Sequence, residues 1–173
     1  MRYALAFLAS ALGLALLAAA AALSGVVSVA ANHVGPLDAR ADALLNAVSR
    51  ASIRRHAPRA VNPFAGDRAA AVEGLAEFRE SCLGCHGART IAPAEFAAGL
   101  NPGAPALDSP DIQAMSDGEL FWVVSNGIRA TGMPAFSGGN DEKQIWKILA
   151  FVRRLPRLTA EETKSLRAGA DTR

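Results

Sequence analysis

The stretch Cys82-Leu83-Gly84-Cys85-His86 contains both cysteines of this 173-residue chain and one of its three histidines. Two residues three positions apart on a helical turn lie on the same side of the helix, so the two thiols can reach one flat ligand together. The imidazole of His86 follows the second thiol directly and can bind a metal ion at the centre of that ligand. The spacing therefore favours a covalently held cofactor with a metal in its middle.

A Cys-x-x-Cys-His run is the attachment motif of haem c, in which both thiols form thioethers and the histidine binds iron. Other uses of the two cysteines compete with this interpretation. A disulfide between Cys82 and Cys85 suits an exported chain, whereas a thioredoxin-like pair requires a βαβ setting that the sequence does not indicate. A structural zinc site needs four ligands, and His33 and His56 bring no second ligand pair at zinc-finger spacing. Both histidines also precede the motif, in a predicted connector, which disfavours them as iron ligands.

The sixth iron ligand decides whether a haem carries electrons or binds small molecules, and the chain has three methionines. Met1 precedes a long apolar segment and is excluded. Met115 directly precedes a predicted helix start, where packing is the better role for a flexible thioether. Met133 lies in Thr131-Gly132-Met133-Pro134, where glycine permits close approach to a flat ligand and proline stiffens the loop. We therefore predict that Met133 and His86 are the axial ligands.

The order of these features resembles the class I monohaem cytochromes c over residues 67 to about 156. The residues that carry the resemblance are Gly74, Phe78, Cys82-x-x-Cys85-His86, Pro105-x-Leu107, Asn126-Gly127, Gly132-Met133-Pro134 and a terminal aromatic-rich helix. The resemblance implies a small all-α cytochrome c fold of roughly three to five helices around one covalently bound haem c. It also implies single-electron transfer rather than enzymatic catalysis.

The resemblance implies roles for individual residues as well. Gly74 and Phe78 are expected to form the contact between the first and last helices of the fold, opposite Ile148 and Phe151. The carbonyl of Pro105 is expected to accept the Nδ1 proton of the haem histidine, which fixes its tautomer and strengthens it as a donor. Simple stiffening of a proline-rich loop is the alternative role for Pro105.

Caps and periodicity predict helices elsewhere in this part of the chain, and no strand pattern or internal repeat is present. Helices are expected over residues 67–81, from the capping box Ser116-Asp117-Gly118-Glu119 to Gly127, from Asn140 or Asp141 to about Leu155, and from the capping box Thr159-Ala160-Glu161-Glu162 to Gly169. Residues 87–115 are expected to be loop with short helical turns. Trp122 and Trp146 have apolar helical neighbours, which favours core packing over a role as an electron path.

The N-terminal segment from Tyr3 to Asn32 has no charged side chain and no histidine. It is long enough to cross a bilayer, whereas a secretory signal has a shorter apolar region. We therefore expect a transmembrane anchor over residues 1–34, with Arg2 on the inner side. Cleavage within residues 28–31, where small residues alternate, is the alternative, and either fate exports the rest of the chain.

A connector is predicted over residues 35–66, followed by the cytochrome c domain over 67–158 and a short polar helix or tail over 159–173. Apolar residues at helical spacing predict an amphipathic helix in the connector: Leu37, Ala41, Leu44, Leu45, Val48 and Ile53. Pro58 and Asn62-Pro63 break it. The basic residues Arg50, Arg54, Arg55 and Arg59 are interpreted as a solvated face, with contact to anionic headgroups as the alternative.

Charge is segregated along the chain. Residues 1–66 carry six Lys/Arg against two Asp/Glu, whereas residues 67–156 carry eight against eleven. The acidic balance predicts redox partners with basic surfaces and does not suggest a nucleic-acid partner. The sequence thus predicts a membrane-tethered electron carrier that serves a respiratory chain or membrane dehydrogenase, at the bacterial inner membrane with its haem domain in the periplasm. A soluble periplasmic form, a haem-based ligand sensor and a cytochrome subunit of a larger oxidoreductase are the alternatives.

Overall fold

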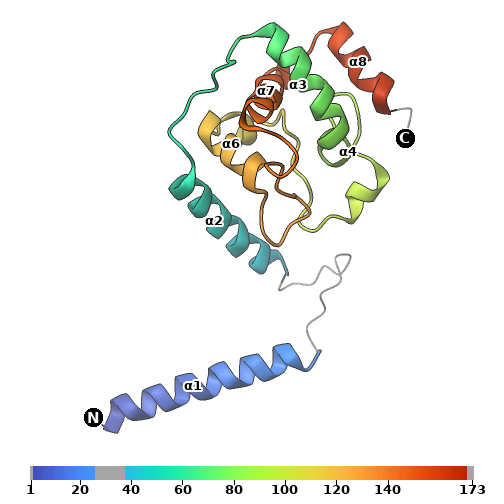
Figure 1. Cartoon of the computed structure of the whole chain (residues 1–173). Helices are drawn as coiled ribbons and strands as arrows, with labels where there is room; N and C mark the ends of the chain where they lie inside the picture. Colours follow the sequence, from blue (N-terminus) through green and yellow to red (C-terminus); the bar gives the residue numbers. More distant parts are fainter. Residues whose placement is uncertain (1, 26–37, 171–173) are drawn as a thin grey trace. The chain divides into compact units, whose positions relative to one another are not determined.

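A computed structural model describes residues 2–25 and 38–170 of the chain (Figure 1). Over these ranges the protein is helical, and its one β-bridge is an isolated pair between Ala88 and Ile91. The predicted all-α class is therefore confirmed. The chain forms two compact units, residues 1–34 and residues 35–173, which we describe separately.

The first unit consists of helix α1 (Arg2–Leu23), whose 22 residues are apolar apart from Arg2 and the short polar side chain of Ser10. Among the described residues, α1 alone is long and apolar enough to cross a membrane, a test that anchors and export signals both pass. Its large apolar side chains are exposed, as the 70% exposure of Leu17 illustrates. The candidate cleavage site at residues 28–31 lies outside the described residues.

The second unit is built around the crossing of α3 (Arg68–Ser81) and α7 (Glu142–Val152), which lie across each other in Figure 1. A Cβ atom on Gly74 would lie 2.0 Å from the carbonyl oxygen of Lys147, so the two backbones touch at this point. One turn further along, the rings of Phe78 and Phe151 meet edge to face at 5.2 Å. The predicted contact between the first and last helices is therefore present. The buried residues around it are Leu75, Phe78, Cys82, Leu83, Ile148, Phe151, Val152, Leu155 and Leu166.

A second apolar cluster joins α6 (Asp117–Asn126) to α7. Leu120, Ile145, Trp146 and Leu149 are its buried members. Phe121 stacks on Trp146 with ring centroids 4.3 Å apart. The predicted core packing of Trp146 is thus confirmed, whereas Trp122 is half-buried and stacks on His56 at 6.1 Å.

The helix starts follow the predicted caps. Asp67 caps α3, and Ser116 and Glu119 form a complete capping box at α6. At α7 the cap is Asp141, one of the two expected residues, in a box with Gln144. Thr159 and Glu162 exchange both capping hydrogen bonds at α8 (Ala160–Ala170).

Two predicted helix ends are wrong. Helix α7 ends at Val152 rather than near Leu155, because Arg154 N–H bonds the carbonyl of Phe151 and the chain tightens into the 3₁₀ turn η2 (Leu155–Arg157). Helix α8 runs through Gly169 to Ala170, since a helical glycine costs only about 1 kcal/mol. The predicted end at Gly127 is confirmed, with φ of 66° at that residue.

Short elements occupy the segment between α3 and α6, as expected. They are α4 (Leu83–His86), the 3₁₀ helix η1 (Glu95–Gly99) and α5 (Pro110–Gln113). These elements run from the cysteine motif to the start of α6.

Helix α2 (Asp38–His56) lies beside α6 in the same compact unit (Figure 1). Ile53 is buried at 7% exposure, whereas Leu44, Leu45 and Val48 are exposed. The chain after α2 approaches α6 so closely that a Cβ on Gly118 would lie 1.8 Å from the carbonyl oxygen of Pro58. The predicted connector is therefore packed against the helical core over its second half.

Candidate haem site

The cysteine motif occupies a single helical turn at the end of α3. Cys82 donates its backbone N–H to Phe78, and its own carbonyl accepts from the N–H groups of Cys85 and His86. Cys82 is buried and Cys85 is half-buried. Both side chains therefore belong to one rigid turn, which leaves them on the same side of the helix.

The imidazole of His86 is oriented by the loop that follows η1. Its Nδ1 lies 2.8 Å from the carbonyl oxygen of Pro105. Because a carbonyl can only accept, Nδ1 must carry the proton, and Nε2 is left with a free lone pair. Burial lowers the pKa of His86, although the Pro105 carbonyl acts in the opposite direction. The ring is thus neutral at pH 7, which is the state that binds iron.

The surroundings of Cys82 do not favour a reactive thiolate. Burial, with smaller effects from Glu77 and Cys85, raises its pKa to about 12. Thioredoxin-like pairs use a thiol whose pKa is lowered, so this environment disfavours that use of the motif. Over residues 2–25 and 38–170, no three His, Cys, Asp or Glu side chains gather where they could hold a metal ion, which disfavours a zinc site.

The segment around Met133 is folded tightly against the end of α6. A Cβ on Gly127 would lie 2.7 Å from the carbonyl oxygen of Met133, so only glycine fits there. Met133 accepts a hydrogen bond from Ile128 N–H, and its own N–H donates to Thr131 Oγ1 at 3.1 Å. The side chain of Met133 is half-buried. The backbone that carries this thioether is therefore fixed at both ends of a short loop.

Helix η1 and the residue after it link the cysteine turn to the methionine loop. A Cβ on Gly84 would lie 3.3 Å from the ring of Phe96, and one on Gly132 would lie 2.5 Å from Leu100 Cδ2. Phe96 lies in η1, and Leu100 is its C-cap. One short element thus contacts both parts of the predicted site.

The donor set in this region fits haem c. It comprises two thiols on one turn, a neutral imidazole with a free Nε2 and a thioether on a fixed loop. A cavity of about 390 Å³ borders His86 and the residues on either side of Pro105, Ala104 and Ala106. Met133 is not part of its lining, so the cavity belongs to the histidine side of the site.

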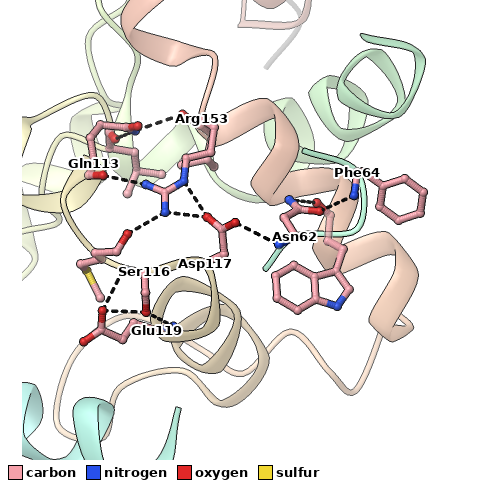
Figure 2. A network of polar contacts seen from close by, with 11 residues as sticks. Asn62, Phe64, Gln113, Ser116, Asp117, Glu119 and Arg153 are labelled. Carbon is pink, nitrogen blue, oxygen red and sulfur yellow. Dashed lines mark hydrogen bonds and ion pairs between the residues drawn. The ribbon is translucent and has the colours of Figure 1, made fainter. Parts of the chain in front are cut away.

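The structure also contains a polar network that sequence reasoning did not anticipate (Figure 2). Asp117, predicted only as part of a helix cap, accepts a hydrogen bond from Asn62 N–H at 2.9 Å and a paired one from Arg153. Arg153 also donates to the carbonyls of Gln113 and Met115. The sequence predicts Asn62 only as a helix breaker, but it is 4% exposed and its side chain donates a hydrogen bond to the carbonyl of Trp146. The network joins the connector, the loop before α6, and α7.

The remaining candidate ligands lie in other settings. Met115 packs against the second apolar cluster, as predicted. His56 places Nδ1 2.9 Å from the carbonyl of Ser52 and stacks on Trp122. His33 lies outside the described residues.

Comparison with known proteins identifies one family. Residues 69–152 match the family model described as cytochrome c oxidase, cbb3-type, subunit III. The matched segment begins in α3 and ends at the last residue of α7, so it contains the cysteine turn, Pro105 and Met133. No curated protein matches the chain.

Proposed function

Residues 69–152 form a c-type cytochrome domain, and from this we propose that the protein carries single electrons on one haem c. In the proposal Cys82 and Cys85 would hold the haem through thioethers, and His86 and Met133 would bind its iron. The haem, when bound, supplies the Fe(III)/Fe(II) couple. The protein supplies ligation, a fixed geometry and an apolar surrounding, and it transforms no substrate.

The observation that carries the proposal concerns His86, the residue directly after the second cysteine. Its Nδ1 lies 2.8 Å from the Pro105 carbonyl oxygen. This contact holds the ring in the tautomer that presents Nε2 to a metal. It also increases the electron density on Nε2, which strengthens the bond to iron. A histidine with a merely structural role would not need its other nitrogen kept free.

Met133 distinguishes electron transfer from ligand sensing. A thioether bound to the iron would favour the ferrous state and raise the reduction potential, and it would occupy the position that oxygen needs. The loop that carries Met133 is fixed by Gly127 and by hydrogen bonds to Ile128 and Thr131, so the ligand is preorganised. These features support a carrier over a haem-based ligand sensor.

A fixed role within an assembly is the second candidate. The family matched by residues 69–152 is described as subunit III of a cbb3-type oxidase. The same haem chemistry would then serve one donor and one acceptor inside a larger oxidoreductase. Co-purification of the tagged holoprotein with stoichiometric partner subunits would favour this role over a free carrier.

The substitution Met133→Ala tests the ligand assignment. We expect the haem to stay covalently attached, because the thioethers are untouched, but the ferric charge-transfer band of methionine-ligated iron should disappear. The ferrous variant should also bind carbon monoxide. Optical spectra of the holoprotein measure both effects, and Met115→Leu, which removes a methionine from the apolar cluster, should leave them unchanged. Unaltered spectra in Met133→Ala would show that the assignment is wrong.

For the membrane, we propose that α1 is a retained anchor in the bacterial inner membrane and that the haem domain faces the periplasm. The length and apolar composition of α1 support this. The intact mass of holoprotein isolated from cell membranes should correspond to all 173 residues plus one haem. A chain that begins near Asn32 would identify a cleaved signal instead.

A further inference from the structure

Helix α2 has an apolar stripe that the protein does not cover. Leu44, Leu45 and Val48 are 66%, 46% and 57% exposed, whereas Ile53 on the same helix is 7% exposed. At about 100° per residue, Val48 and Ile53 are about 140° apart around the helix axis. The helix therefore has two apolar faces, of which only the one with Ile53 packs on the domain.

The free stripe cannot turn inward, because α2 is fastened at its C-terminal end. Ile53 is buried, and the next turn places His56 against Trp122 of α6. Immediately afterwards Pro58 touches the backbone of Gly118, and Asn62 bonds Asp117. These contacts prevent α2 from rotating about its axis, so Leu44 and Val48 stay directed away from the core.

Basic side chains accompany the stripe. Arg40, Arg50, Arg54 and Arg55 are all exposed. At about 100° per residue, Arg55 lies about 20° and Arg40 about 80° from Val48 around the helix axis, whereas Arg54 and Arg50 lie about 120° and 160° away. Residues 38–59 contain five arginines and only two acidic residues, Asp38 and Asp42. An apolar stripe beside arginines is the arrangement of helices that lie in the interface of an anionic bilayer. A basic protein partner would be repelled by the same surface.

We propose that α2 lies on the surface of an anionic bilayer, with Leu44, Leu45 and Val48 inserted at the boundary of the acyl chains. Fourteen residues separate Leu23 of α1 from Asp38 of α2, a distance of at most about 50 Å even when extended. With α1 in the membrane, α2 is therefore confined near the same surface, and docking becomes an intramolecular step. This last argument rests on the proposed anchor; the stripe and its arginines do not.

The proposal gives the packed connector a function. Because α2 is fixed on α6, its contact with lipid would orient the whole haem domain and not only the tether. The domain would then meet its redox partners with one face already committed to the bilayer. A flexible tether over residues 35–66 would leave that orientation free.

Spin labels can test this in the full-length holoprotein in lipid nanodiscs. The only cysteines are Cys82 and Cys85, which the haem occupies, so Leu44→Cys and Val48→Cys can be labelled selectively. Val72→Cys on α3, where the native side chain is 55% exposed, is the matched control. In nanodiscs with phosphatidylglycerol we expect the labels at positions 44 and 48 to be accessible to oxygen and shielded from a Ni(II) chelate. The label at 72 should show the reverse.

The opposite results would overturn the proposal. Labels at 44 and 48 that are as accessible to the chelate as the label at 72 would show a solvated stripe. Labels shielded from both reagents would show that protein, including a second copy of this chain, covers it. If α1 is cleaved as a signal, the same labels can be measured on the shorter chain after phosphatidylglycerol vesicles are added. The test of α2 then does not depend on whether the anchor is retained.

Charge provides a second arm of the test. Arg55→Gln in the Val48→Cys background should lower the ratio of docked to undocked protein roughly fivefold, whereas Arg68→Gln on α3 should leave it unchanged. Nanodiscs of phosphatidylcholine alone should lower the ratio in every variant. Equal docking in both lipids would show that electrostatic attraction to the lipid plays no part. Haem spectra that stay unaltered in every variant would show that a loss of docking is not a loss of the proposed haem site.

Discussion

At Asp117 one carboxylate connects three segments of the chain. Its Oδ2 accepts from Asn62 N–H, and its Oδ1 accepts from Nε and Nη2 of Arg153. Burial of the group acts to raise its pKa, but the Asn62 amide and the Arg153 guanidinium outweigh it, so the pKa of Asp117 is lower than its ordinary value of 3.8. The folded state therefore favours the charged form of this side chain.

Asp117→Asn should destabilise the protein by about 2 kcal/mol at neutral pH, because charge-assisted hydrogen bonds to Arg153 are lost. A folded pKa below the unfolded one gives stability that is complete above about pH 5 and is lost as pH falls through the folded pKa. The difference between wild type and variant should thus shrink on acidification. Urea unfolding of the holoprotein at several pH values measures it, with the exposed Asp111→Asn as control. A difference that grows in acid would contradict the assignment.

Residues of the site differ in how far the sequence identifies them. Cys82, Cys85 and His86 are contiguous, so their spacing alone indicates shared chemistry. Pro105 follows only from the resemblance, since nothing local marks a carbonyl as the partner of a histidine 19 positions away. The link from Asn62 to Asp117 spans 55 positions and no periodic pattern encodes it, which is why a helix breaker and a capping residue were predicted in place of a network.

At the scale of elements, helix starts were predictable and helix packing only partly so. A capping box is complete within four residues, and those at Ser116 and Thr159 form as expected. Helix ends depend on turns beyond the helix, as η2 shows after α7. The amphipathic pattern of α2 predicted a helix but not its packing. Apolar residues at helical spacing indicate that one face is apolar, but they do not indicate what covers that face. Of that pattern only Ile53 is buried among the described residues.

The crossing of α3 and α7 depends on one missing side chain. A Cβ at position 74 would lie 2.0 Å from the carbonyl oxygen of Lys147, so Gly74→Ala should force the helices apart and cost about 3 kcal/mol or more. In an isolated helix the same change would stabilise by about 0.5–1 kcal/mol. Thermal unfolding of the holoprotein shows whether Gly74→Ala lowers or raises the stability of the protein. Gly139→Ala, where a Cβ meets no atom within 4 Å, is the control and should change little.

At the scale of the molecule, the distribution of charge along the chain, more than the net charge, determines which surfaces attract lipid and which attract redox partners. The chain has a net charge of +2, yet residues 67–156 carry eight basic and eleven acidic side chains. Most of the excess positive charge lies before residue 67, where six basic residues outnumber two acidic ones, and part of it borders the exposed stripe of α2. On an anionic bilayer those arginines would face lipid headgroups, which would leave the acidic part of the domain to approaching proteins.

Electron transfer should therefore depend on the charge of the partner. With a basic redox protein as partner, the second-order rate should be fast at low ionic strength and fall as salt is added, because screening removes the attraction beyond about 10 Å at 0.1 M salt. With an acidic partner, added salt should raise the rate. Stopped-flow kinetics of the full-length holoprotein in phosphatidylglycerol nanodiscs measures both. The acidic domain would not be the docking surface if the rate with the basic partner were insensitive to salt while the acidic partner reacted faster as salt was removed.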